Sequence, residues 1–178
     1  MAAAIHRGLR GLLWAGLALA LMGCLSGPEN LALGPMARPL PDGVYVEFDE
    51  MGEPQNALVL TSRPDGIYRH SDFDLRFFES GLGEGIYFVS YLDRGGASID
   101  GTLYGVVEVR GDAVSYPLTL CGDAPADLRA ELQLDTGDGA SCEISDPEVM
   151  KRMLEAIWRA TKGAGSRQRW VRQTTLRR

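Results

Sequence analysis

The stretch LYGVVEVRGDAVSYPLTL, from Leu103 to Leu120, carries the clearest β-structure signal in the chain. Its first part alternates between two faces, with Leu103, Gly105, Val107 and Val109 on one and Tyr104, Val106 and Glu108 on the other. This period of two is typical of a β-strand. Gly111 and Asp112 then fit the two-residue turn of a hairpin. Because Pro117 has no N–H to donate, we expect the second strand to lie at an edge or a bulge.

The same kind of turn recurs along the chain. An acidic residue, Gly, a β-branched residue and Tyr occur in order at Asp42–Tyr45, Asp65–Tyr68 and Glu84–Tyr87, and in a stretched form at Asp100–Tyr104. The acidic residue and Gly favour a turn, and the next residues favour the start of a strand. The copies are spaced too unevenly for a solenoid. They therefore predict an antiparallel meander, as an open sheet or a barrel-like body.

Two helices are expected after the hairpin. Residues 122–133 begin with Asp123 at an N-cap position and Pro125 in the first turn, which predicts a short helix. Ser145 and Glu148 then have capping-box spacing. The helical stripe that follows, up to about Thr161, consists of Val149, Met150, Met153, Leu154, Ile157 and Trp158. The predicted fold class is α+β, mainly antiparallel β, with a C-terminal amphipathic helix packed on the sheet.

The first residues have a different character. His6, Arg7 and Arg10 form a short basic region, and Gly11–Gly23 is a run of 13 uncharged residues. A membrane span needs about 20 apolar residues, so this run has the length of a signal-peptide core instead. The sequence Leu21-Met22-Gly23-Cys24 that ends it resembles the lipobox of bacterial lipoproteins.

This resemblance implies that Cys24 carries a covalent lipid, including acyl groups such as palmitate, and that residues 1–23 are removed as a signal peptide. Leu25 and Ser26 stand where an Asp would retain such a protein in the inner membrane. The resemblance therefore implies a lipid-anchored protein of the cell envelope, on the outer membrane and facing the periplasm. The alternative is that Cys24 is an unmodified residue at the end of a signal peptide.

The composition of the remaining chain suggests three parts. Residues 24–41 contain several prolines and glycines and are expected to form an extended tether behind the lipidated cysteine. The alternative for this segment is packing along the domain through Leu31, Leu33 and Met36. Residues 42–162 are expected to form the periplasmic β-rich domain, and residues 163–178 a basic, flexible tail.

The expected oxidation state of the two cysteines of the body follows from the same localisation. In an oxidising compartment Cys121 and Cys142 form an even pair and are expected to be joined by a disulfide. The loop of 20 intervening residues gives roughly 3 kcal/mol of stabilisation in the chain-entropy model. A metal site would need partners such as histidine, and the segment between them contains none.

Charge is distributed unevenly along the chain. Residues 25–162 contain 11 Lys and Arg against 24 Asp and Glu, whereas residues 163–178 contain five Arg and no acidic residue. The tail is a candidate for contact with anionic lipid headgroups or other polyanions. The residues expected to make that contact are Arg167, Arg169, Trp170, Arg172, Arg177 and Arg178. Folding back onto the acidic domain and remaining solvated are the two alternatives.

The sequence contains one group that suggests metal chemistry. If residues 70–74 are extended, His70, Asp72 and Asp74 share a face and are weak candidate ligands for a divalent metal. The alternative is a solvated strand or loop with Phe73 and neighbouring apolar residues turned to the core. We find no convergent acid, base and nucleophile in the sequence, and no cofactor is expected beyond the lipid.

Two functions therefore remain open. The first is a non-catalytic envelope lipoprotein that binds another envelope protein or a small ligand. The second is a periplasmic enzyme or metal-dependent protein that uses the His70 region. Nucleic acid is not expected as a partner of a chain outside the cytoplasm.

Overall fold

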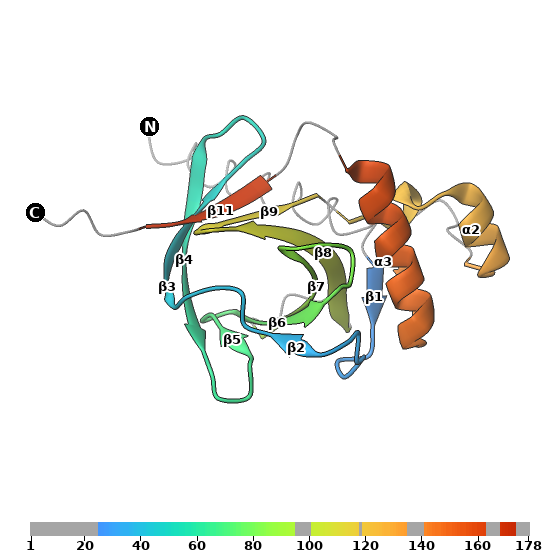
Figure 1. Ribbon diagram of the computed structural model, residues 1–178, viewed down its shortest axis with the longest axis horizontal. Helices are drawn as coiled ribbons and strands as arrows, with labels where there is room; N and C mark the ends of the chain where they lie inside the picture. Colours follow the sequence, from blue (N-terminus) through green and yellow to red (C-terminus); the bar gives the residue numbers. More distant parts are fainter. Residues whose placement is uncertain (1–24, 95–100, 118, 135–140, 163–167, 174–178) are drawn as a thin grey trace, which may run out of the picture.

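Strands dominate the computed structural model, which describes residues 25–94, 101–117, 119–134, 141–162 and 168–173 (Figure 1). The strands are β1 (Leu25–Gly27), β2 (Met36–Ala37), β3 (Gly43–Phe48), β4 (Pro54–Ser62), β5 (Tyr68–Arg69), β6 (Phe73–Glu79), β7 (Ile86–Asp93), β8 (Thr102–Arg110), β9 (Ala113–Tyr116), β10 (Cys142–Glu143) and β11 (Gln168–Arg172). The helical segments are η2 (Cys121–Asp123), α2 (Ala126–Glu131) and α3 (Pro147–Thr161).

Eight of the described strands close into a barrel. The order around it is β8, β7, β6, β5, β4, β3, β11 and β9, and β9 pairs again with β8. Each of these pairings is antiparallel. The prediction of a mainly antiparallel β fold is thus confirmed. Closure leaves none of these eight strands as a free edge.

The predicted hairpin and turns are present. Arg110 of β8 pairs with Ala113 of β9, so Gly111 and Asp112 form the two-residue turn. Gly111 has φ of +58°, a conformation that glycine adopts at little cost. Strand β9 ends at Tyr116, directly before Pro117. The expectation that this strand lies at an edge or a bulge is wrong, because β9 pairs with β8 on one side and with β11 on the other. The strand ends before the missing N–H of the proline can interrupt the ladder.

The barrel separates two apolar clusters. The interior cluster contains Tyr45, Leu60, Tyr68, Leu75, Phe77, Val107 and Val114, all buried. The outer cluster contains Phe78, Phe88, Tyr104, Val106 and the buried face of α3, namely Met150, Met153, Leu154, Ile157 and Trp158. Figure 1 shows α3 beside the barrel, near β1. Neighbouring residues of β8 therefore point into different cores.

The helices start at positions other than those predicted. Asp146, rather than Ser145, caps α3, because its carboxylate accepts hydrogen bonds from the backbone N–H groups of Glu148 and Val149 at 2.8 and 3.0 Å. A cap directly before Pro at the first helical position is a common arrangement. Asp123 does not cap α2, and its carboxylate accepts the N–H of Leu120 instead, at 3.1 Å.

The segment expected to be a tether, residues 24–41, is packed on the body in its described part, residues 25–41. Leu25 is completely buried, since β1 lies between β8 and β10. Leu31 and Leu33 are buried in the outer cluster, whereas Met36 is 46% exposed. The prediction of an extended tether is therefore wrong. Removal of these leucine side chains from water favours the packed arrangement, and the stiffness of the prolines does not oppose it.

The basic tail of residues 163–178 is also not a separate flexible segment where it is described. Residues 168–172 form β11, which pairs with β3 on one side and β9 on the other. Strand β11 follows α3 in the chain and completes the barrel. The expectation of a flexible end is thus wrong for these residues.

Candidate functional site

A cavity of about 200 Å³, partly open to solvent, lies at the interior face of the barrel. It is lined by Leu75, Phe77, Val89, Tyr91, Leu103, Tyr104, Gly105, Val106, Val107, Tyr116, Pro117, Thr119 and Trp170, and these residues come largely from β6, β7, β8, β9 and β11. The lining is almost entirely apolar. Eight strands form an interior that side chains can fill or that holds one small ligand.

The register of the strands explains why these side chains converge. Phe77 of β6 lies opposite Val89 of β7, and Val89 lies opposite Gly105 of β8. Residues directly opposite one another project from the same face of a sheet. Gly105 supplies no side chain, and a Cβ there would lie 3.5 Å from Val89 and 3.4 Å from Thr119. The absence of a side chain at Gly105 therefore contributes to the open volume.

A polar pair adjoins the cavity at Tyr116. Its hydroxyl donates a hydrogen bond to Glu47 Oε1 at 2.7 Å, and Asn56 Nδ2 donates to the other carboxylate oxygen at 3.4 Å. Burial raises the pKa of Tyr116 well above its ordinary value, and the hydrogen bond to Glu47 raises it further. The phenol therefore stays protonated and acts as a donor to the carboxylate.

Trp170 lies next to this pair. Its ring centroid is 5.2 Å from that of Tyr116, and its side chain projects inward from β11 beside Glu47 of β3. The indole Nε1 is buried and has no hydrogen-bond partner among the described residues. An interaction between this N–H and the phenol of Tyr116 lowers the Tyr116 pKa, against the larger effects that raise it, but it falls short of hydrogen-bonding geometry. A buried donor without an acceptor is costly.

The basic residues around Trp170 predicted a different role for it, as an anchor in the membrane interface. The cavity was not predictable from the sequence, because its lining is drawn from five strands whose partners depend on barrel closure. The alternation of Gln168, Trp170 and Arg172 with Arg169 and Val171 was the available signal for a strand. A run of five alternating residues is too short to predict a strand without knowledge of its partners.

The structure separates the candidate metal ligands. Residues 70–72 form the turn between β5 and β6, so residues 70–74 are not one extended strand. His70 Nδ1 lies 3.9 Å from the Asp72 carboxylate, whereas Asp74 is buried and paired with Arg69 at 3.3 Å and Arg94 at 2.5 Å. The proposed common face is therefore wrong. Phe73 does point into the barrel interior, as the alternative predicted.

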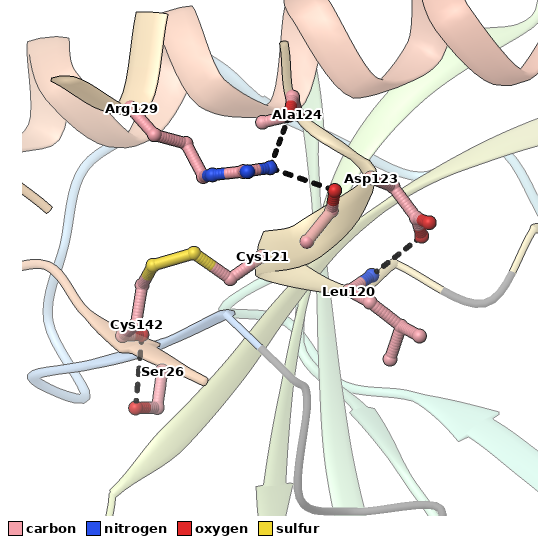
Figure 2. Close-up of a disulfide and its surroundings, with 8 residues drawn as sticks. Ser26, Leu120, Cys121, Asp123, Ala124, Arg129 and Cys142 are labelled. Atoms are coloured by element: carbon pink, nitrogen blue, oxygen red, sulfur yellow. Dashed lines mark hydrogen bonds between the residues drawn. A yellow bond between two sulfur atoms is a disulfide. The ribbon is translucent and has the colours of Figure 1, made fainter. Parts of the chain in front are cut away.

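The structure joins Cys121 and Cys142 (Figure 2), with their Cα atoms 5.7 Å apart. Both are buried in the outer cluster. Ser26 Oγ donates to the carbonyl of Cys142 at 3.4 Å, and Arg129 donates to carbonyls on the other side of the bond. The disulfide thus connects η2 to β10, next to β1.

The remaining candidate contacts of the tail divide into two groups. Arg169 lies on the outside of β11, 5.3 Å above the ring of Phe48. Arg172 donates to the carbonyl of Asp42 at 2.7 Å and lies 3.6 Å from the Asp112 carboxylate. Both arginines therefore contact the barrel itself. The other candidate contacts of the tail lie outside the described residues, namely Arg167, Arg177 and Arg178. The candidate lipidation site, Cys24, also lies outside them.

The chain matches no protein-family model, no curated protein and no solved structure in the comparisons made. Among the described residues, no helix has both the length and the apolar character to cross a membrane. Within the same ranges, His, Cys, Asp and Glu side chains form no group of three that could hold a metal ion.

Proposed function

We propose that this protein is a lipid-anchored component of the bacterial cell envelope with a non-catalytic role, and that its barrel binds a small apolar molecule. The cavity enclosed by β6, β7, β8, β9 and β11 is the observation that carries the proposal. A concave, apolar site with a few polar groups at its side is the usual form of a small-molecule site.

The anchored location rests on the lipobox resemblance at Cys24 and has independent support. The Cys121–Cys142 pairing suits an oxidising compartment, where such bonds form and persist. Mass spectrometry of protein isolated from bacterial membranes is expected to find acyl mass on Cys24 and no residues before it. A full-length, unmodified chain in the membrane fraction would contradict the anchor.

Binding is tested by filling the cavity. In the full chain held in phospholipid nanodiscs, ethylbenzene should raise the melting temperature, because a ligand that binds only the folded state stabilises it. Gly105→Val should abolish that rise, since the new side chain occupies the cavity. Gly105 has no positive φ, so valine is compatible with the strand.

The matched control is Val59→Leu, which enlarges a side chain on the outside of the barrel, where Val59 is 56% exposed. It should keep the response to ethylbenzene. An equal response in Gly105→Val and in the unaltered chain would show that the compound acts elsewhere, for example on the bilayer. No response in any of the three proteins, either to ethylbenzene or to acetophenone, would contradict the proposed function.

A further inference from the structure

We infer that the cavity selects neutral molecules with a compact apolar body and one oxygen acceptor, which receives a hydrogen bond from Trp170 Nε1. This inference rests on the proposed function, because it specifies the ligand class of the same cavity. It also assigns Trp170 and Tyr116 distinct roles. Trp170 contacts the ligand oxygen, whereas Tyr116 holds Glu47 away from it.

The unpartnered indole N–H is the first argument. Three other polar side chains of the lining already have acceptors. Tyr104 donates to the carbonyl of Pro28, Tyr116 donates to Glu47 at 2.7 Å, and Thr119 Oγ1 donates to the carbonyl of Pro117 at 3.3 Å. Trp170 contributes the one buried lining atom that has no partner among the described residues. A ligand oxygen at the indole N–H removes this cost, and a hydrocarbon of the same size does not.

The charge of the surroundings is the second argument. No Lys or Arg is among the described residues that line the cavity, and the Glu47 carboxylate accepts the hydrogen bond of the Tyr116 hydroxyl. An anionic group would enter an apolar site next to a carboxylate, which is unfavourable. A cation would not reach Glu47, because that carboxylate is outside the lining and already accepts from Tyr116 and Asn56. A neutral oxygen therefore fits best.

The volume limits the body of the ligand. An apolar cavity of roughly 150 Å³ is enough for benzene. The present cavity, at about 200 Å³, suits one six-membered ring with a short substituent. Acetophenone has this form and carries a neutral carbonyl oxygen. Ethylbenzene lacks the oxygen, benzoate is anionic, and benzylammonium is cationic. Comparison of the four compounds therefore separates the effect of the oxygen acceptor from the effect of charge.

The test is a titration of the full chain in phosphatidylcholine nanodiscs with each of the four compounds, followed by NMR of ¹⁵N-labelled tryptophan. The Trp170 indole signal is identified by its loss in Trp170→Phe. Acetophenone should bind about fivefold more tightly than ethylbenzene, as one added hydrogen bond implies. It should also move the indole N–H signal downfield, whereas benzoate and benzylammonium should bind more weakly than either neutral compound.

Two variants separate the roles of the aromatic residues. Trp170→Phe should bind acetophenone and ethylbenzene equally, because the donor is gone. Tyr116→Phe keeps the indole N–H and releases Glu47, so it should reduce the discrimination against benzylammonium. Equal binding of acetophenone and ethylbenzene by the unaltered chain, or tighter binding of a charged compound, would overturn the inference and leave the proposed function standing. Failure of both neutral compounds to bind would overturn both.

Discussion

Strand β11 should be indispensable to the barrel, and this can be tested by ending the chain after Lys162. The shortened protein lacks the strand that pairs with β3 through four residues and with β9 through four more. Cross-strand pairs contribute roughly 0.2–1 kcal/mol each. We therefore expect the loss of these pairings alone to lower the free energy of unfolding by about 4 kcal/mol.

The loss of Trp170 adds to that figure. Removal of a large aromatic core side chain costs about 3–5 kcal/mol, and the lower end applies because Trp170 is only half-buried. Together the losses reach roughly 7 kcal/mol, which is comparable with the whole unfolding free energy of a small domain, about 5–15 kcal/mol. Two newly exposed edges, on β3 and β9, also favour aggregation.

The assay is thermal unfolding followed by near-ultraviolet circular dichroism. The chain that ends after Lys162 should show no cooperative transition. A chain that ends after Gln173 is the matched control, because it keeps all of β11 and should unfold like the complete protein. Trp170→Ala should be intermediate, with a melting temperature lower by about 6–12 °C for a loss of about 3 kcal/mol. Cooperative melting of the shorter chain within a few degrees of the control would refute this reasoning.

Three further outcomes are expected. Reduction of the Cys121–Cys142 bond, which spans 21 positions, should lower the free energy of unfolding by about 3 kcal/mol. A Cys121→Ala/Cys142→Ala double variant should not respond to the reductant. An equal response of the two proteins would contradict this prediction. Burial raises the pKa of Tyr45 and Tyr91 to about 12, so these phenols lose their protons at lower pH in the unfolded chain than in the folded protein. The free energy of unfolding, measured in urea, should therefore be steady below pH 10 and fall as pH rises from 10 to about 12. A constant free energy over this range would contradict the prediction. Asp74→Asn should lower the unfolding free energy by about 2 kcal/mol, because it weakens both arginine contacts of a buried carboxylate; an unchanged urea midpoint would show that the pairs contribute nothing.

Local features of the fold were predictable because their causes are local. Gly111 and Asp112 produce a tight hairpin through the conformational freedom of glycine. The constraint from Pro117 was also local, but it ends the strand instead of placing it at an edge, because β9 stops at Tyr116. The pairing of Cys121 with Cys142 followed from an even count. These signals lie within short stretches or depend on composition alone, so no knowledge of distant contacts was needed.

The cavity and the two terminal segments depended on distant contacts. Leu25 is buried only because β8 and β10 lie on either side of β1, and the sequence around it, rich in Pro and Gly, is typical of a linker. Trp170 points inward only because β11 fills the gap between β3 and β9. The positive charge of residues 163–178 predicted a basic tail, although Arg169 and Arg172 of this segment contact the barrel. Closure of the barrel decides the orientation of Trp170, and pairing outside the barrel decides the burial of Leu25. Periodicity along the sequence encodes neither.

The buried position of β1 limits when a lipid could be attached to the residue before it. Leu25, the first residue of β1, follows Cys24 directly and is completely buried between two other strands. If Cys24 is lipidated as proposed, the enzymes that modify it and cut before it must act while β1 is still undocked, because they need this stretch accessible. Under the same condition, removal of the signal peptide would precede the docking of β1. Because one residue spans at most about 3.6 Å, a lipid on Cys24 would hold β1 close to the bilayer surface and would fix which side of the protein faces the lipid.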